Sequence, residues 1–278
     1  MSLARAKVNL WLNVVGRRAD GFHLLDSLVA FTDLADDIEV TPASDLSLEV
    51  VGPEASALDG DSDNLVLKAA RLLAGRAGLA PRAALRLTKR IPVAAGLGGG
   101  SADAAATLLA LVDLWRVAMP PEELFDLAAT LGADVLMCLA GRPALATGIG
   151  ERLARVPALP ACAILLVNPG VALPTPAVFR ARQGGFSPPR PIDDGWRNLS
   201  DFAQELARRG NDLTDAAISL RPEVAAVLDR LRHSDGAAHV AMSGSGATCF
   251  ALYGSDEEAQ RAASLLPAAW WRHVGRLA

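Results

Sequence analysis

Apolar and polar residues alternate near the start of the chain, from position 4 to position 15. The apolar positions are Ala4, Ala6, Val8, Leu10, Leu12 and Val14, and the positions between them are Arg5, Lys7, Asn9, Trp11 and Asn13. A period of two predicts one half-buried strand over this range. The segment 16–21, which begins and ends with glycine, is then expected to form a turn.

The rest of the chain carries short strand-like segments and longer segments with helical spacing. The predicted strands lie at 27–31, 37–41, 46–51, 85–88, 239–242 and 248–252. The predicted helices lie at 64–75, from the glycine-rich stretch to 115, and at 120–131, 196–209, 222–233 and 256–266. The Pro- and Gly-rich segment 169–194 is typical of a long surface connection. Strands and helices interleave without a regular strand–helix–strand order, so the pattern predicts an α+β fold.

The composition changes this picture by excluding whole classes of protein. The chain has 278 residues, of which 51% are hydrophobic and 21% are charged. This is enough for one large domain or two modest ones with a real core, and it excludes wholesale disorder. The net charge of −4 provides no overall attraction to nucleic acids or to anionic membranes.

The cysteines and the apolar runs indicate a soluble protein. Cys138, Cys162 and Cys249 are odd in number, far apart and without CxxC spacing, so we expect core residues in a reducing cytoplasm. The runs 104–112 and 161–167 are shorter than the ~20 residues that a membrane span needs. Near the N-terminus, polar residues interrupt every apolar run, so no signal-peptide core is expected.

The most informative stretch of the chain is the glycine-rich segment 96–100. Gly96, Gly98, Gly99 and Gly100 stand between a predicted strand and a predicted buried helix, which Ser101 is expected to cap. Backbone N–H groups without side-chain cover, together with the positive end of a helix dipole, bind anions. The segment therefore predicts a phosphate-binding loop, and a flexible glycine turn is the alternative.

Three better-known motifs do not fit this loop. The P-loop pattern is absent because no lysine follows the glycines. The dinucleotide-binding fingerprint fails because Ser101 stands where its third glycine would be. The pattern GxSxG is also missing, which argues against Ser101 as a nucleophile.

Other candidate residues are ambiguous when each is taken alone. Lys7 and Asn9 share a face of the first predicted strand, but a lysine there usually extends its ammonium to solvent. Asp134 follows a predicted helix end and could be a cap. His23 could be an ordinary loop residue. The segment SGSGAT at 243–248 could be a simple hairpin turn.

The order of these segments resembles that of the GHMP small-molecule kinases. The resembling segments are ARAKVNL at 4–10, GRRADGFH at 16–23, GLGGGSADAA at 96–105, LGADV at 131–135 and SGSGAT at 243–248. The resemblance implies a two-domain α+β fold. Its parts would be a ribosomal-protein-S5-like, ATP-binding domain at 1–155 and a ferredoxin-like α/β domain at 156–278.

The resemblance further implies ATP-dependent phosphoryl transfer to an alcohol. Asp134 matches the catalytic base, and Lys7 matches the group that polarises the acceptor hydroxyl or stabilises the transferred phosphoryl. One carboxylate and one ammonium can supply the positioning and charge neutralisation that this chemistry needs. Asn64 could equally cap its own helix, and Mg²⁺ would be carried by ATP without a dedicated protein site. The positions that match the ATP site are Asn64, Lys89, Pro92, Val93, Ala94, Ala95, Gly96, Leu97, Gly98, Gly99, Gly100, Ser101 and Ala102.

The acceptor that the resemblance implies carries a cytidine. Phe22 and Phe179 match two rings that clamp the base, and His23 matches an imidazole that bonds the edge of the base. Edge hydrogen bonds select a base more strictly than stacking does, so His23 is expected to select cytosine. Asn9 would orient the acceptor, and Thr175 lies in the same substrate-side segment. For Phe179, core packing is an equal alternative.

Three positions depart from the family pattern: Ala4 and Leu136 replace prolines, and Phe22 replaces a tyrosine and so lacks its hydroxyl. Kinases of the family that act on homoserine, mevalonate or a sugar are the first alternative, but the Lys7–Asn9 strand argues against them. A non-catalytic nucleotide sensor is disfavoured because a sensor needs no Lys7 and Asp134. RNA binding, suggested only by shared architecture, is disfavoured by the net charge of −4.

Overall fold

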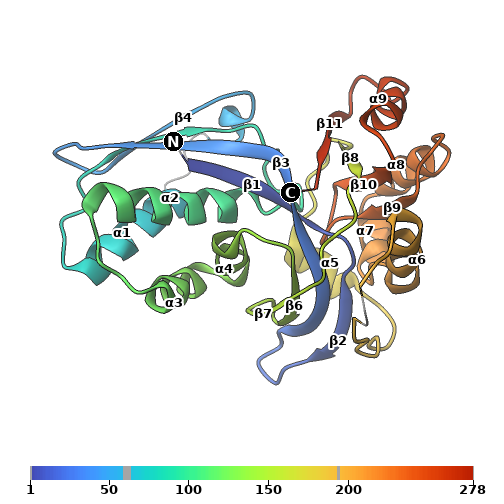
Figure 1. Ribbon diagram of the computed structural model, residues 1–278, viewed down its shortest axis with the longest axis horizontal. Helices are drawn as coiled ribbons and strands as arrows, with labels where there is room; N and C mark the ends of the chain where they lie inside the picture. The colour runs from blue at the N-terminus through green and yellow to red at the C-terminus, as the bar shows by residue number, and fades with distance from the viewer. Residues whose placement is uncertain (1, 59–63, 193–194, 278) are drawn as a thin grey trace. The chain divides into compact units, whose positions relative to one another are not determined.

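The computed structural model describes residues 2–58, 64–192 and 195–277, and it has an α+β fold (Figure 1). Contacts divide the chain into two compact units, each built from segments that lie far apart in the sequence. Unit 1 contains the residues up to Lys7, Leu34–Val93 and Gly98–Gly141. Unit 2 contains Val8–Asp33, Ala94–Leu97 and the residues from Arg142 onward.

Unit 1 packs helices against a small group of strands. Strand β5 (Ala84–Thr88) pairs in parallel with β4 (Ser47–Val51) and antiparallel with residues 37–41 of β3 (His23–Thr41). Strand β1 (Ser2–Asn9) also pairs with β3, and a short 3₁₀ helix occupies Ala55–Leu58. The helices are α1 (Leu65–Ala77), α2 (Gly99–Trp115), α3 (Pro121–Leu131) and α4 (Ala133–Ala140).

Helix α2 is the centre of unit 1 and contacts both α1 and α4. Its residues 102–108 are all buried, and most of them are alanines. Small side chains let neighbouring helices approach closely on several sides, and a helix that is apolar all round belongs in a core. This packing fixes the N-terminus of α2, which is the end that carries the glycine segment.

Unit 2 combines a hairpin-based sheet with a second, antiparallel sheet. Strand β2 (Asn13–Arg17) pairs with the start of β3, and β6 (Ala144–Gly148) pairs with both β3 and β7 (Arg152–Arg155). The second sheet has the order β11-β8-β10-β9. Its strands are β8 (Ala163–Asn168), β9 (His239–Met242), β10 (Cys249–Tyr253) and β11 (Trp271–Arg276). The helices are α5 (Thr175–Ala181), α6 (Leu199–Arg209), α7 (Thr214–Leu220), α8 (Glu223–Arg232) and α9 (Asp256–Ser264).

The single strand expected over 4–15 is in fact two strands, β1 and β2. Backbone pairing changes between them, because Leu10 donates its N–H to the Leu28 carbonyl at 2.8 Å, and Leu12 donates its N–H to the Gly210 carbonyl at 3.1 Å. The half-buried prediction is also wrong from Lys7 onward, since residues 6–14 are buried whichever way they point. The polar residues Lys7, Asn9 and Asn13 of β1 and β2 are therefore buried.

The two strands expected at 27–31 and 37–41 are one long strand, β3. The polar residues between them read as a break in the sequence, but Asp36 is fully buried. Its carboxylate accepts the backbone N–H groups of Arg90, at 2.5 Å, and Ile91, at 2.8 Å. A buried carboxylate that is satisfied in this way does not interrupt a strand.

Helix α2 begins two residues before Ser101, so the expected cap at Ser101 is wrong. Gly98 is the N-cap, with a φ of 66° and no side-chain cap hydrogen bond, and its carbonyl accepts the N–H of Ala102 at 2.9 Å. Glycine adopts this left-handed conformation without strain, which allows the helix to start earlier. The first backbone N–H groups of α2 are consequently left without a side-chain cap.

Most of the predicted helices and strands are present to within a few residues, and several others were not predicted. Helix α5 lies within 169–194, where a connection was expected; residues 193–194 are outside the described part of the chain. The elements that the pattern did not predict are α4, α5, α7, β6, β7, β8, β11 and the 3₁₀ helix at Ala55–Leu58. Each is short or buried on both faces, so it shows no clear period.

The compact units are discontinuous in the sequence, because 8–33 belongs to unit 2 while 34–93 belongs to unit 1, and the domain division at 155 stays a prediction. Strands β1 and β3 each contribute residues to both units. Cys162 and Cys249 are buried, as expected for small core residues, whereas Cys138 is only partly buried. None of the helices in the described residues is long and apolar enough to cross a membrane.

Candidate active site

A lysine and an aspartate meet in unit 1. The Nζ of Lys7 lies 3.5 Å from Oδ2 of Asp134, and the Lys7 side chain is 8% exposed against 46% for Asp134. Asp134 stands in the first turn of α4, whose N-cap is Gly132. The Asp134 side chain is therefore an ion-pair partner rather than the helix cap that the sequence also allowed. The pair offers one carboxylate that solvent or a substrate can reach, beside one sheltered ammonium.

The glycine-rich N-terminus of α2 lies against the same lysine. A Cβ added to Gly98 would lie 2.7 Å from Cγ and 3.0 Å from Cε of Lys7. Only a residue without a side chain can let the Lys7 stem pass at this distance. The uncapped N–H groups of α2, the positive end of its dipole and the Lys7 ammonium are thus features of one small region of unit 1.

A buried ion cluster lies beneath Gly99, the first residue of α2. Lys89 is 2% exposed, and its Nζ hydrogen-bonds to Asp36 and, at 2.7 Å, to Asp103. A Cβ on Gly99 would lie 2.9 Å from this Nζ. The ammonium of Lys89 is thus hydrogen-bonded to two carboxyl groups, which supports the loop from below.

The charges of this cluster shift one another's protonation. Burial works to lower the pKa of Lys89, but the negative charges of Asp103 and Asp36 outweigh it, so the pKa of Lys89 is raised. Burial raises the pKa of Asp103 more than Lys89 lowers it, so the net shift of the Asp103 pKa is upward. Among the described residues, Oδ1 of Asp103 meets no hydrogen-bond partner.

Asn64 is a helix cap, which was one of its two predicted roles. Its Oδ1 accepts the N–H of Val66 at 2.9 Å, and the residue is buried at the N-terminus of α1. This bond uses the amide oxygen, so the nucleotide role remains a prediction.

The preceding part of the loop packs within unit 2 against the second glycine motif. A Cβ on Gly96, whose φ is 79°, would lie 2.6 Å from the Gly246 carbonyl oxygen. The Oγ of Ser243 donates to the Gly96 carbonyl at 3.2 Å, and the N–H of Thr248 donates to the Ala95 carbonyl at 3.2 Å. The segment SGSGAT is therefore a support for residues 94–97, and it is more than an ordinary hairpin turn.

Two acceptor-side candidates are also tied to their neighbours in unit 2. The Nδ2 of Asn9 donates to the Oγ of Ser27 at 2.8 Å, and the backbone N–H of Asn9 donates to the Oγ of Ser243 at 3.2 Å. The Oγ1 of Thr175 lies 2.8 Å from the Oγ of Ser245. Asn9 thus contacts both β3 and the segment SGSGAT, and Thr175 contacts SGSGAT.

His23, and not Phe22, is the ring that meets Phe179. The two ring centroids are 5.0 Å apart at an interplanar angle of 24°, while Phe22 is 58% exposed. Burial, aided by the charges of Arg17 and Arg182, lowers the pKa of His23, so its imidazole is neutral near pH 7. A neutral imidazole has one donor and one acceptor nitrogen, which suits the polar edge of a base.

Sequence reasoning missed Asp36 and Asp103, and it named Ser243 only as part of the segment SGSGAT. Asp103 could have been found, because it lies four residues after Gly99 and therefore faces the same side of the helix. Asp36 could not, because it lies 53 residues from Lys89 and only the fold brings the two together.

In the described ranges 2–58, 64–192 and 195–277, no group of three or more His, Cys, Asp or Glu side chains could hold a metal ion. Asp134 is one exposed carboxylate, and its partner is an ammonium. This donor set fits Mg²⁺ that is ligated by phosphates and water, and it does not fit a protein cage.

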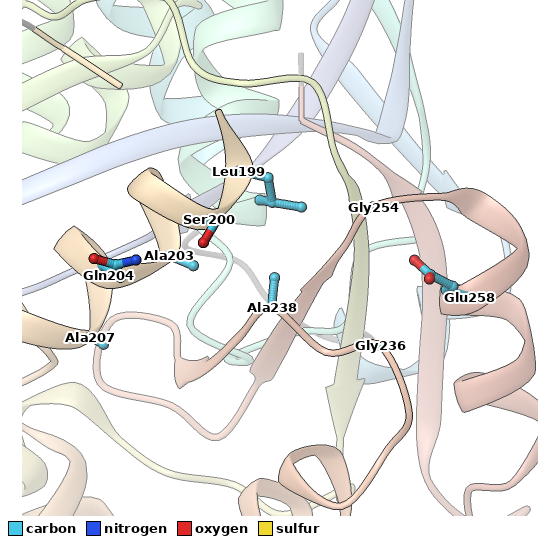
Figure 2. A pocket seen from close by; sticks show the side chains of 9 residues that line it. All are labelled: Leu199, Ser200, Ala203, Gln204, Ala207, Gly236, Ala238, Gly254 and Glu258. Atoms are coloured by element: carbon cyan, nitrogen blue, oxygen red, sulfur yellow. The ribbon is translucent and has the colours of Figure 1, made fainter. Parts of the chain in front are cut away.

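Figure 2 shows a separate pocket in unit 2 with a volume of about 480 Å³. Five residues of α6 line it, together with Gly236, Ala238, Gly254 and Glu258, and none of its lining residues belongs to the candidate site. Its one carboxylate, Glu258, already accepts the N–H of Ser255 in the capping box of α9. We assign it no role.

Comparisons with known proteins agree with this geometry. Residues 64–142 match the GHMP kinases N terminal domain, and residues 195–271 match the GHMP kinases C terminal domain. A 4-diphosphocytidyl-2-C-methyl-D-erythritol kinase of Paramagnetospirillum magneticum is 53% identical over 271 residues, covering 96% of this chain and 95% of that protein. One of Rhodospirillum rubrum is 49% identical over 277 residues, covering 99% and 91%.

Solved structures place the fold in the same family. A crystal structure of 4-(cytidine 5'-diphospho)-2C-methyl-D-erythritol kinase has a TM-score of 0.83 and 42% identity, covering 99% of this chain and 98% of that one. The homoserine kinase of Cytophaga hutchinsonii shares the fold, with a TM-score of 0.68 at 20% identity and coverage of 99% and 95%. This chain therefore belongs to the GHMP kinase family, and it groups there with the 4-diphosphocytidyl-2-C-methyl-D-erythritol kinases.

Proposed function

We propose that this kinase transfers the γ-phosphoryl group of ATP to the 2-hydroxyl of 4-diphosphocytidyl-2-C-methyl-D-erythritol, giving the 2-phosphate and ADP. The step belongs to non-mevalonate isoprenoid precursor synthesis. Relatives with that name, about half identical over nearly the whole chain, support the acceptor. The observation that carries the chemistry is the Lys7–Asp134 pair beside the glycine-rich N-terminus of α2.

Asp134 is the base in this proposal. Its partly exposed carboxylate accepts the proton of the acceptor hydroxyl as the oxygen attacks the γ-phosphorus, and the bond to the β-phosphate oxygen breaks. The sheltered ammonium of Lys7 stabilises the negative charge of the transferring phosphoryl, and at 3.5 Å it also orients the Asp134 carboxylate. Direct transfer of this kind relies on positioning and charge neutralisation more than on covalent chemistry.

The ATP phosphates bind at the segment from Pro92 to Ala102. The uncapped N–H groups at the start of α2 and its dipole favour the anion. Mg²⁺ bound to the nucleotide would neutralise phosphate charge there. Lys89 supports this loop through Gly99, and Asn64 completes the nucleotide side at the N-terminus of α1.

Residues of unit 2 recognise the acceptor. The neutral His23 bonds the cytosine edge, Phe22 and Phe179 supply stacking faces, and the base displaces the direct contact between His23 and Phe179. Thr175 and Asn9 orient the polar remainder of the molecule, with Asn9 two residues from Lys7 along β1. ATP and one small acceptor are the partners, in the cytoplasm, without nucleic acid or membrane.

An ADP-release assay over a panel of acceptors tests the proposal. The panel holds the cytidyl diphospho-methylerythritol, homoserine, mevalonate and galactose, with an ATP-only control. We expect ADP release well above the control only with the cytidyl acceptor. Preference for another acceptor would make the chain a different GHMP kinase, and release with none of them would favour a nucleotide sensor.

A further inference from the structure

The connection between α6 and α7 in unit 2 contains two polar residues, Asn211 and Asp212, that have no role in the chemistry proposed above. Two backbone hydrogen bonds join this connection to the residue before β2. Leu12 donates its N–H to the Gly210 carbonyl at 3.1 Å, and its own carbonyl accepts the N–H of Asp212 at 2.9 Å. The connection is therefore paired with the strand segment beside it.

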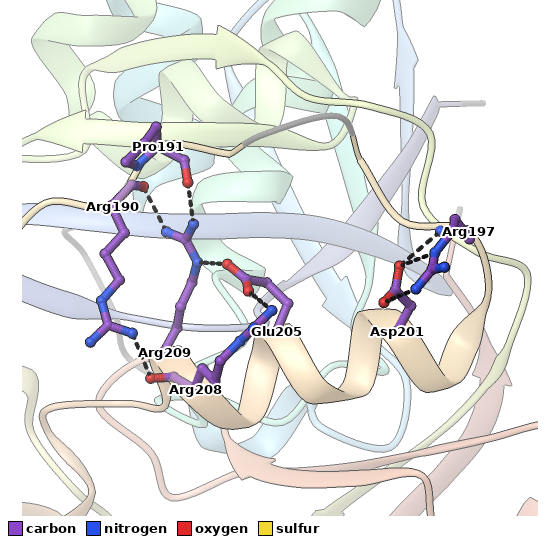
Figure 3. Close-up of polar contacts among 7 residues, drawn as sticks. All are labelled: Arg190, Pro191, Arg197, Asp201, Glu205, Arg208 and Arg209. Atoms are coloured by element: carbon purple, nitrogen blue, oxygen red, sulfur yellow. Dashed lines mark hydrogen bonds and ion pairs between the residues drawn. The ribbon is translucent and has the colours of Figure 1, made fainter.

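The last turn of α6 fixes the start of this connection. The Arg209 side chain lies there and is only 1% exposed. Figure 3 shows its guanidinium bonded to the Glu205 carboxylate, at 2.6 Å, and to the backbone carbonyls of Arg190 and Pro191, at 2.9 and 2.7 Å. The guanidinium carbon also lies 4.2 Å from the centroid of the Trp11 indole ring. A buried cation with these partners holds the helix end in place.

The carboxylate of Asp212 joins the C-terminal end of α5 to β2. Its Oδ2 accepts the backbone N–H of Val14 at 2.7 Å and the hydroxyl hydrogen of Ser187 at 2.8 Å, and its Oδ1 accepts the Nδ2–H of Asn13 at 3.2 Å. The Nη2 of Arg182, which is the C-cap of α5, lies 3.7 Å from the same Oδ2. The Arg182 side chain is 8% exposed, so water screens this ion pair little.

Asn211 acts on the other end of α5 through the segment SGSGAT. Its Nδ2 donates to the backbone carbonyls of Met242 and Gly244, both at 2.8 Å. The next residue, Ser245, has its Oγ 2.8 Å from the Oγ1 of Thr175, the first residue of α5. Both ends of α5 are thus connected by polar contacts to the same two-residue connection.

The elements joined in this way carry the two rings that meet in unit 2. Phe179 lies on α5, three residues before Arg182, and His23 on β3 pairs with Arg17 on β2. The ring centroids of Phe179 and His23 are 5.0 Å apart. The charge of Arg182 adds to burial and to the charge of Arg17 in lowering the pKa of His23, so the guanidinium lies near that ring. The contacts of Asp212 therefore fix where α5 stands relative to His23.

We infer that Asp212 is a positioning residue for the acceptor base, acting through α5 and the ring of Phe179. The inference rests on the proposed function, in which His23 and Phe179 bind the cytosine. A stacking face stabilises a base only at a set distance and tilt from the group that bonds the edge of the base. Asp212 holds the end of α5, and α5 holds the Phe179 ring in its place beside His23.

Steady-state kinetics of Asp212→Asn test the inference, with the KM for the acceptor and kcat as separate readouts. The substitution keeps the size of the side chain, removes the charge toward Arg182 and leaves one acceptor oxygen in place of two. We expect the acceptor KM to rise about three- to tenfold, which lies within the range of couplings between contacting residues. The KM for ATP and kcat should stay within twofold. A merely structural role would lower the melting temperature and the active fraction without changing the acceptor KM selectively.

The variant Phe179→Ala separates action through the ring from other routes. If Asp212 acts through Phe179, then Asp212→Asn should change the acceptor KM less than twofold in the Phe179→Ala protein. Arg182→Gln removes the same ion pair from the other side, and it should also raise the acceptor KM alone. It serves if Asp212→Asn does not fold, and the same criteria apply.

Asp201→Asn is the matched control. The Asp201 carboxylate also pairs with an arginine, the exposed Arg197, but it lies near the start of α6 (Figure 3). Both KM values of this variant should equal those of the parent protein.

An unchanged acceptor KM in folded Asp212→Asn, or a rise of the same size in the Phe179→Ala protein, would overturn the role of Asp212 and leave the proposed function standing. Absence of phosphorylation by the unmodified protein would instead refute the proposed function itself.

Discussion

The ammonium of Lys7 lies 3.5 Å from the carboxylate of Asp134, and the lysine is sheltered while the aspartate is nearly half exposed. This difference in exposure suits the two side chains to different roles. A sheltered cation attracts a phosphoryl group strongly because water screens it little. An accessible carboxylate can reach a substrate proton.

Replacing Asp134 by Asn removes the base while keeping the size of the side chain. We expect kcat to fall at least ~10²-fold, which is the smaller end of general-base contributions. The Kd for ATP should stay within a few-fold, because the glycine loop is unchanged. Stopped-flow or coupled-assay kinetics measure the first quantity, and calorimetry measures the second. Asp126→Asn, on the exposed side of α3, is the control and should behave as the parent protein. An unchanged kcat in Asp134→Asn would remove this residue from the mechanism.

Two alanine substitutions in the glycine loop should differ sharply. Gly98→Ala puts a Cβ 2.7 Å from the Lys7 side chain at a φ of 66°, so Lys7 must move. We expect kcat/KM for ATP to fall about 10- to 100-fold, because small misplacements of aligned groups are that costly. Gly100→Ala meets only Leu65 Cδ1, at 3.8 Å, and should be near neutral. Equal kinetics of the two variants would contradict the close contact between the Lys7 side chain and Gly98.

The buried cluster of Lys89, Asp36 and Asp103 predicts a pH-dependent stability. The pKa of Asp103 is raised from 3.8 to about 8. The folded protein therefore holds this proton where the unfolded chain releases it, so Asp103 costs stability increasingly as pH rises from about 4 to about 8.

Asp103→Asn removes that titration. The melting temperature of Asp103→Asn minus that of the parent protein should be at least about 2 °C higher at pH 8 than at pH 5. This difference corresponds to roughly 1 kcal/mol at this length. Differential scanning fluorimetry at both pH values measures the difference. A pH-independent difference, or one of opposite sign, would show that Asp103 titrates normally.

His23 should select the base, and Phe22 should supply only a stacking face. His23→Ala should raise the KM for the cytidyl acceptor about 5- to 100-fold, since an unpaired polar partner costs about 1–3 kcal/mol. It should also narrow the preference over a uridyl analogue. Phe22→Ala should weaken both analogues alike, and Phe22→Tyr should be near neutral. If His23→Ala keeps the parent ratio of cytidyl to uridyl kcat/KM, base selection lies in other groups of the loop.

Local rules predicted much of the fold from the sequence, and long-range partners explain where those rules failed. Helix α1 with its cap at Asn64 and helix α3 with its proline start follow directly from capping and spacing. Strand β3 did not, because Asp36 resembles a break until Arg90 and Ile91, more than fifty positions away, supply donors for it. The helix start at Gly98 was missed because Ser101 is the better cap by residue type, whereas Gly98 alone tolerates the backbone angle.

The same distinction applies to the candidate site, where local motifs could be predicted from the sequence and long-range contacts could not. The glycine loop and the family motifs identified Lys7, Asp134 and His23 as candidates, and the structure gives each a partner. It could not be seen from the sequence that His23 would meet Phe179, because their ring contact joins β3 to α5. Nor could the sequence show that the buried Arg209 contacts Trp11 and Asp26, which lie near the other end of the chain.

The central claim is phosphoryl transfer from ATP to the alcohol of the cytidyl acceptor. The most direct test is ³¹P NMR of the purified protein with Mg²⁺, ATP and 4-diphosphocytidyl-2-C-methyl-D-erythritol. The account predicts a new phosphomonoester resonance that grows in step with ADP, one ester for each ADP, while the diphosphate resonances of the acceptor persist. Formation of ADP with only inorganic phosphate, or no ADP at all, would contradict it.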